Sequence, residues 1–142
     1  MQPGPVIEFR HIAWDELQAF LARERSLINR DVDQDVRFMN YVMYAEQRVE
    51  GLCLDGELVG FARWDIRTRH LSNLYVTPAA RGHGVGRKFI QDRQIDSLYV
   101  MPHNHEAKKL YSRLGFHQIA CAVPSREFMI RPKYAIAGRS AA

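Results

Sequence analysis

A turn that contains three glycines is the part of the sequence best suited to binding chemistry. Gly82, Gly84 and Gly86 follow a segment that reads as a strand, and a helix is expected to begin among them. Free backbone N–H groups at the start of a helix attract anions, and the missing Cβ atoms let a phosphate approach the backbone closely. Arg81, Arg87 and Lys88 add positive charge beside the turn. The turn is therefore predicted to bind a phosphate-bearing ligand.

The spacing of these glycines excludes two common phosphate-binding motifs. A Walker P-loop has the order Gly-x4-Gly-Lys, and counted from Gly82 the chain has Arg87 where the second glycine would stand. A dinucleotide fingerprint, GxGxxG, requires a third glycine where the chain has Arg87 or Phe89. Taken alone, the segment is also compatible with a glycine-rich loop that binds nothing.

Two motifs that follow one another along the chain resemble those of a known protein family. Arg81-x-x-Gly84-x-Gly86, after a strand, resembles motif A of the GNAT superfamily of acyl-CoA-dependent N-acyltransferases. Residues 104–116 are similar to motif B of that family, Asn-x-x-Ala-x-x-Leu-Tyr-x-x-x-Gly-Phe, at every defined position. The resemblance extends from about residue 6 to residue 131, although residues 14–47 match only in being helical. It implies direct transfer of an acetyl group from acetyl-CoA to a primary amine, with no metal.

The resemblance also implies which residues contact acetyl-CoA. Backbone N–H groups from Arg81 to Arg87 would bind the pyrophosphate, and Leu74 and Val76 would pair with the pantetheine arm. The N–H of Val76 would also face the thioester carbonyl as the oxyanion donor. Asn104 would contact the pantetheine from the opposite strand end. The expected cofactor residues are Leu74, Tyr75, Val76, Arg81, Gly82, His83, Gly84, Val85, Gly86, Arg87, Asn104 and Tyr111.

Tyr111 stands at the family position of the general acid. A phenol with a pKa of about 10 can protonate a leaving thiolate whose conjugate acid has a pKa of about 8.5. A tyrosine packed in the core with a satisfied hydroxyl is the alternative reading of the same position.

The general base is expected at His70, and Ser72, two residues further on, is expected to border the same active site. Some relatives carry a catalytic glutamate near this point of the strand, and alternate residues of a strand share one face. Histidine, with an unperturbed pKa of about 6.5, is a suitable base. An exposed turn residue is the alternative for His70, and Glu46 or Asp35 acting through water are further candidates for the base.

Two other residue sets are expected to have no catalytic part. His103, His105 and His117 lack the regular spacing of a metal site. Cys53 reads as a small buried hydrophobic residue, and with Cys121 it shows no CxxC motif or disulfide framework.

The elements that must position these residues alternate in type along the chain. The Asp55-Gly56 pair marks a hairpin. Strands are predicted at residues 6–12, 48–54, 57–66, 70–76, 95–100, 116–123 and 126–131, and helices at 14–25, 32–43, 84–92 and 104–114. This order predicts an α/β (α+β) fold with a mixed, mostly antiparallel sheet of six to seven strands and about four helices. The resemblance implies that two strands splay apart around the acyl-CoA, and the helix over 84–92 is short for the family.

One domain is expected over residues 1–131, followed by a flexible tail at 132–142. The net charge is +4, but residues 1–50 carry six Lys or Arg and nine Asp or Glu, whereas residues 51–142 carry fourteen and seven. This uneven distribution of charge would be explained if the basic C-terminal segment faces a phosphorylated cofactor and the acidic N-terminal segment faces a cationic amine. Asp31, Asp33, Asp35 and Glu46 supply the acidic side, although solvated helix faces account for the same charges.

Several partners and locations are expected to be absent. No apolar run approaches the roughly 20 residues of a membrane span, and no signal peptide is evident, so a cytoplasmic protein without a membrane partner is expected. Nucleic acid is expected only as the carrier of an amine, as in aminoacyl-tRNA, and members of the family often form homodimers. An acyl-CoA-binding regulatory module with weak or no turnover is the alternative to an enzyme.

Overall fold

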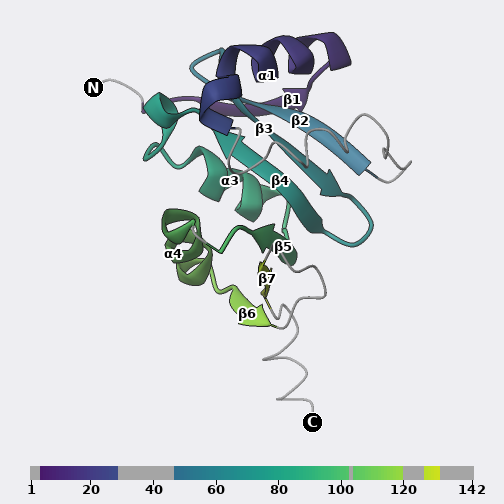
Figure 1. The fold of residues 1–142 in the computed structure, drawn as a ribbon, viewed down its shortest axis with the longest axis vertical. Helices are drawn as coiled ribbons and strands as arrows, with labels where there is room; N and C mark the ends of the chain where they lie inside the picture. Colours follow the sequence, from purple (N-terminus) through teal and green to yellow (C-terminus); the bar gives the residue numbers. More distant parts are fainter. Residues whose placement is uncertain (1–3, 29–46, 103, 120–126, 132–142) are drawn as a thin grey trace.

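The computed structural model describes residues 4–28, 47–102, 104–119 and 127–131 (Figure 1). A seven-stranded sheet forms the centre of the fold, in the order β1-β2-β3-β4-β5-β7-β6. Its strands are β1 (Ile7–His11), β2 (Gln47–Leu54), β3 (Glu57–Asp65), β4 (His70–Val76), β5 (Ser97–Val100), β6 (His117–Ile119) and β7 (Glu127–Ile130). The helices are α1 (Trp14–Ile28), the 3-10 turn η1 (Pro78–Ala80), α3 (Val85–Asp92) and α4 (His105–Arg113).

The sheet is mixed and mostly antiparallel. Only the β4–β5 pair is parallel, and the other five pairs of neighbours are antiparallel. The predicted fold class is therefore confirmed. The described residues contain three α-helices, and the further helix expected at residues 32–43 falls outside them. No helix in the described ranges is both long and apolar enough to cross a membrane.

The β2–β3 hairpin forms where the sequence predicts it. Asp55 and Gly56 both have positive φ, 52° and 83°, as the two central residues of a type I′ turn require. Asp55 also ties the turn to the start of β1, because its N–H donates to the carbonyl of Val6 and its Oδ1 accepts from the Val6 N–H, both at 2.8 Å. The hairpin thus fixes the register of the first three strands.

Helix α1 packs on one face of the sheet. Leu17, Phe20 and Leu21 are buried against Phe61 of β3, as their helical spacing predicts. Trp14 differs from the expectation: it begins the helix with 42% of its surface exposed. The helix also extends to Ile28, three residues beyond the predicted end. The helical pattern identified the buried face but not the exposure of its first residue.

Helices α3 and α4 share a second core on the other face. This core contains Val85, Phe89 and Ile90 of α3, which are packed with Leu71 of β4 and Tyr111 of α4. Because Phe61 and Ala62 are adjacent on β3 and belong to the two different cores, the cores lie on opposite faces of the sheet. Helix α3 has only eight residues, as the sequence predicts.

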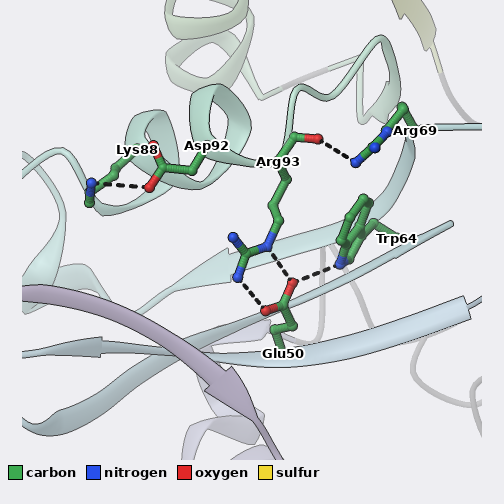
Figure 2. A network of polar contacts seen from close by, with 6 residues as sticks. All are labelled: Glu50, Trp64, Arg69, Lys88, Asp92 and Arg93. Atoms are coloured by element: carbon green, nitrogen blue, oxygen red, sulfur yellow. Dashed lines mark hydrogen bonds and ion pairs between the residues drawn. The ribbon is translucent and has the colours of Figure 1, made fainter. Parts of the chain in front are cut away.

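The C-terminal end of α3 is fastened to the sheet by an ion pair (Figure 2). Arg93, the C-cap residue, donates from Nε and Nη2 to the carboxylate of Glu50 on β2, at 2.8 and 2.6 Å. Trp64 on β3 donates its indole N–H to the same carboxylate at 2.8 Å. The guanidinium also lies 5.3 Å from the ring centroid of Phe9 and 5.6 Å from that of Phe89. Three strands and one helix therefore meet at Glu50.

We predict that Glu50→Ala lowers the free energy of unfolding by about 2 kcal/mol, because it leaves the partly buried Arg93 guanidinium and the Trp64 N–H without an acceptor. Urea denaturation measures this value. Asp92→Asn is the control, since the Lys88–Asp92 pair (Figure 2) is largely exposed, at 45% and 41%, and its loss should cost less than about 0.5 kcal/mol. Equal effects of the two substitutions would contradict a special role for Glu50.

Candidate functional site

Strands β4 and β5 separate soon after they begin. They pair as parallel strands at only two positions, His70 opposite Ser97 and Leu71 opposite Leu98. Beyond these rungs β4 continues to Val76 along β3 without pairing with β5 (Figure 1). The expected splay between two strands is therefore present. A strand edge left without a sheet partner offers backbone N–H and C=O groups to a ligand.

A β-bulge lies in β4 where the two strands part. The pairing with β3 shifts by one residue, so that Ser72 has no residue opposite to it. His70 and Asn73 stand opposite Asp65 and Arg63, which share one face of β3. The bulge therefore brings His70 and Asn73 onto the same face, where strict alternation would separate them. The predicted place of Ser72 beside His70 is not decided by this pairing and stays a prediction.

Arg63 is a buried residue of this face that the sequence did not single out. Only 9% of its surface is exposed. Its Nε donates to Oδ1 of Asn73 at 2.8 Å, and its Nη1 donates to Oε1 of Gln47 at 3.2 Å. Both of these partners are neutral, and burial lowers the pKa of Arg63. An arginine between Ala62 and Trp64 in a strand gives no signal of such burial, because the burial comes from its tertiary surroundings.

His70 is held on three sides. Its Nδ1 lies 2.8 Å from Oγ of Ser97. The ring meets Tyr99 edge to face at a centroid distance of 4.5 Å and stacks on Phe128 at 5.6 Å. Its Nε2 is buried and has no hydrogen-bond partner in the part of the chain that the structure describes. The alternative of an exposed turn residue is wrong, because His70 begins β4 and is half-buried.

The charge state of His70 follows from this environment. Burial lowers the pKa of its imidazole to about 4, and the positive charge of Arg63 adds to the lowering, whereas Asp65 opposes it. His70 is therefore neutral near pH 7, with an unprotonated ring nitrogen available as an acceptor.

Tyr111 lies on the other side of the sheet. It is 6% exposed in the core that α3 and α4 share, and its ring meets Phe116 at a centroid distance of 6.2 Å. Burial raises the pKa of its phenol to about 12, so the group is protonated at neutral pH. This burial fits both a core tyrosine and an acid. The predicted acid and base thus belong to opposite faces of the sheet.

The glycine turn has the backbone that its sequence predicts. Gly82 and Gly84 have φ of 87° and 82°, in the left-handed region that favours glycine, and Gly84 is the N-cap of α3. No side chain among the described residues caps this helix start, so its first N–H groups are left for water or a ligand. Arg81 returns to the strand and donates from Nε to the carbonyl of Val76 at 2.9 Å. His83 approaches the carbonyl of Ala80 at 3.1 Å.

Asn104 has a structural task that the sequence analysis did not assign. It is the N-cap of α4, where its Oδ1 accepts from the N–H of Ala107 at 3.2 Å. Because Oδ1 already accepts this hydrogen bond, we expect the NH₂ group of Asn104 to make the predicted contact with pantetheine, which stays a prediction.

The remaining candidates from the sequence are histidines, acidic residues and cysteines. Within the described ranges no three His, Cys, Asp or Glu residues are grouped as metal ligands would be. Cys53 is buried in β2 at 4% exposure, as expected for a small hydrophobic residue. Five predicted acidic or metal candidates and the second cysteine lie outside the described residues: Asp31, Asp33, Asp35, Glu46, His103 and Cys121.

A cleft of about 590 Å³ lies between α1 and the start of β3. Its charged lining is Glu16, Arg23, Glu24 and Glu57, and Thr77 closes it just beyond the end of β4. Glu24 accepts a hydrogen bond from the hydroxyl of Tyr75 at 3.2 Å, beneath the cleft. This cleft lies on the same face of the sheet as His70 but at the other end of β4, which runs from His70 to Val76.

We predict that His70 makes the protein less stable in acid. The unfolded histidine binds a proton below a pKa of about 6.5, whereas the folded one does so only near a pKa of about 4, so stability is lost as the pH falls through this window. Between pH 7 and about pH 4.5 the native chain should lose about 2 kcal/mol more than His70→Gln. Urea denaturation of both proteins at the two pH values measures the difference, and parallel losses would contradict the burial of a neutral histidine.

Solved structures with the same fold include acetyltransferases. The chain is 20% identical to an acetyltransferase from Thermus thermophilus, with a TM-score of 0.67 over 89% of this chain and 97% of that one. It is 18% identical to the PaiA N-acetyltransferase of Thermoplasma acidophilum in complex with coenzyme A, with a TM-score of 0.61 over 87% and 97%. The N-acetyltransferase PseH of Campylobacter jejuni, in complex with acetyl coenzyme A, is 17% identical, with a TM-score of 0.56 over 87% and 96%.

The family comparison rests on sequence. No curated protein matches the chain. The family model of the acetyltransferase (GNAT) domain matches residues 40–118, which include the splayed strands, the glycine turn and α4. The chain therefore belongs to the GNAT family of acetyltransferases.

Proposed function

We propose that the protein is an N-acetyltransferase that moves an acetyl group from acetyl-CoA directly to a primary amine in a ternary complex. The observation that carries the proposal is the splay of β4 from β5 with an uncapped helix start at the end of β4. The pantetheine arm of acetyl-CoA carries amides that can form hydrogen bonds with a free strand edge. Its pyrophosphate can accept hydrogen bonds from the N–H groups at a helix start. The two features stand here in the order in which the parts of acetyl-CoA require them.

The direction of the backbone in β4 supports the assigned pantetheine contacts. The N–H of Thr77 points toward β3, where it donates to the carbonyl of Val59 at 2.8 Å. Because successive backbone groups of a strand point in opposite directions, Leu74 and Val76 direct their N–H groups toward the splay. Both N–H groups are then available to the pantetheine arm. Because the arm leaves the pyrophosphate at the glycine turn, the thioester at its far end lies nearer to Leu74, which replaces Val76 as the proposed donor to the thioester oxygen. Gly82 to Arg87 bind the pyrophosphate, with Arg81 and Arg87 beside it.

Tyr111 is the proposed acid. The amine nitrogen attacks the thioester carbon, and the negative charge moves to the carbonyl oxygen, which the Leu74 N–H stabilises. When the C–S bond breaks, the sulfur takes a proton from the Tyr111 hydroxyl. Because the pKa of the Tyr111 phenol is about 12, the hydroxyl keeps its proton near neutral pH and can donate it.

His70 is the proposed base. The proton lost by the amine goes to Nε2 of His70, the buried ring nitrogen that has no partner within the described residues. Ser72, at the bulge, is proposed to border the same position. Because Tyr111 and His70 belong to opposite faces of the sheet, acid and base reach the splay from its two sides, with the thioester between them.

The proposed acceptor is a small cationic amine, or a lysine or amino terminus of a protein. The acidic lining of the cleft under α1 supports a cation, because Glu24 and Glu57 outnumber Arg23. The third carboxylate, Glu16, is paired with Arg10 at 2.7 Å. Asp31, Asp33 and Asp35 add negative charge to the same part of the sequence. The proposed catalytic unit is residues 1–131, and a homodimer is compatible with the proposal.

An acyl-CoA-binding regulatory module is the second candidate. It is favoured by the low pKa of His70, about 4, which makes its imidazole a weak base at neutral pH. The same fold would then bind acetyl-CoA without efficient transfer.

Free thiol release from acetyl-CoA separates the two candidates. The panel contains spermidine, an aminoglycoside, a lysine peptide and peptides with free amino termini, and a thiol reagent measures the coenzyme A set free. An N-acetyltransferase gives amine-dependent release with at least one acceptor. Tight binding of acetyl-CoA by calorimetry with no release from any acceptor would favour the regulatory module.

The matched control for the cofactor site is a pair of glycine variants. Gly84→Ala and Gly56→Ala introduce the same strain, because both glycines have φ near +80° (82° and 83°). Only Gly84→Ala should weaken the binding of coenzyme A, by about tenfold, which is about 1.4 kcal/mol. Equal coenzyme A affinities of the two variants would place the pyrophosphate elsewhere.

We predict that Tyr111→Phe lowers kcat by about 100-fold, the loss expected for a proton donor, and changes the dissociation constant of coenzyme A less than about twofold. The ring packing against Phe116 is kept, so the fold should be retained. Steady-state kinetics and calorimetry measure the two quantities. Undiminished turnover would make Tyr111 a core residue only.

A further inference from the structure

The two ring nitrogens of His70 have different surroundings. Nδ1 lies 2.8 Å from Oγ of Ser97. Nε2 is buried and has no hydrogen-bond partner among the residues described. Buried polar atoms without a partner are rare in folded proteins and call for a physical explanation. Here the explanation depends on which of the two nitrogens carries the proton.

The hydrogen bond to Ser97 has two possible directions. If the serine hydroxyl donates to Nδ1, the imidazole proton sits on Nε2 as a buried donor with no acceptor. If Nδ1–H donates to Oγ, Nε2 holds a lone pair. The second arrangement avoids a buried N–H without an acceptor, a kind of orphan that is rare among the backbone groups of proteins, so we adopt it.

We propose that Ser97 is a positioning residue: its Oγ accepts the Nδ1–H of His70 and so keeps the lone pair on Nε2, ready to take the proton of the acceptor amine. The inference rests on the proposed role of His70 as the base. Ser97 does not touch the reacting atoms and acts only through the histidine. No motif pointed to it, because 27 residues separate it from His70.

The sheet fixes the place of the serine hydroxyl. Ser97 is the first residue of β5 and stands opposite His70 on the first rung that joins β5 to β4. The preceding residue, Asp96, donates its backbone N–H to the carbonyl of Arg69 at 2.9 Å. The two side chains therefore meet at the point from which the strands diverge, where backbone hydrogen bonds join the two strands.

The aromatic neighbours fix the plane of the ring. Phe128 lies nearly parallel to the imidazole, at 18°, and Tyr99 is nearly perpendicular to it, at 77°. The charged groups that act on His70 come from β3, namely Asp65 and Arg63. The side chains that β5 and β7 bring against the ring are Ser97, Tyr99 and Phe128. The choice of tautomer is thus left to Ser97.

Nitrogen-15 NMR of histidine-labelled protein at pH 7.5 tests the inference without any substrate. His70→Gln assigns the signals. In the native chain Nδ1 of His70 should be protonated and Nε2 unprotonated. Ser97→Ala should shift the ring toward the Nε2–H tautomer, and Ser97→Thr, which keeps the hydroxyl, should restore the native pattern. A protonated Nε2 in the native chain, or an unchanged tautomer in Ser97→Ala, would overturn the inference.

Kinetics with an acceptor that the amine panel identifies gives the second readout. Ser97→Ala should lower kcat about tenfold, the effect typical of a lost orienting hydrogen bond, and leave the KM for acetyl-CoA unchanged. Ser97→Thr should stay within about twofold of the native kcat. Ser112→Ala, on the exposed side of α4, is the control and should have native kinetics.

The experiments can contradict the positioning role of Ser97 and the base role of His70 independently. If His70→Gln loses activity while Ser97→Ala keeps full kcat, Ser97 has no positioning role and the base assignment stands. If His70→Gln keeps full kcat, the proposed base is wrong, and Ser97 is a structural partner of His70 even where the NMR result is as expected.

Discussion

The ion pair between Arg93 and Glu50 decides the direction of α3, and the glycine turn depends on that direction. A helix of eight residues is too short to be stable by itself, because isolated helices need roughly 12–15 residues. Its orientation therefore comes from tertiary contacts at both ends. Phe89 and Ile90 bury its apolar side, and Arg93 fastens its last turn to β2. The first turn is consequently held at the end of β4, where a pyrophosphate would have to bind.

The second constraint is that β4 pairs along its length with β3 but at only two positions with β5. The bulge at Ser72 lies where β4 stops pairing with β5. It turns Asn73 toward the α1 face, where strict alternation would have turned it away. Asn73 is thereby brought to Arg63. In the proposed mechanism, one strand thus offers its free edge to a thioester, its α1 face to an amine and its other face to Tyr111. This division explains how a small sheet can bring three partners together.

Local signals predicted much of the fold and of the cofactor side of the site. The Asp55-Gly56 hairpin, the length of α3 and the glycine conformations all depend on neighbouring residues, so the sequence carries them directly. The acceptor side was less predictable because its contacts join distant residues. Ser97 meets His70 only through the register of two parallel strands, and Arg63 is buried only because the bulge turns Asn73 toward it. No periodicity in the chain encodes either contact.

The basic excess of the C-terminal part has a narrower meaning in the structure than in the sequence. Four of its cations have carboxylate partners of their own: Lys88 with Asp92, Arg93 with Glu50, Lys108 with Glu127 and Arg131 with Asp96. Within each pair the two opposite charges lie close together, so their fields largely cancel beyond a Debye length of about 8 Å. The charge that a cofactor phosphate would experience is therefore local and comes from Arg81 and Arg87 beside the glycine turn. The net charge counts every cation equally. A cation that lies beside a carboxylate stabilises the fold, whereas a cation without such a neighbour can bind a ligand.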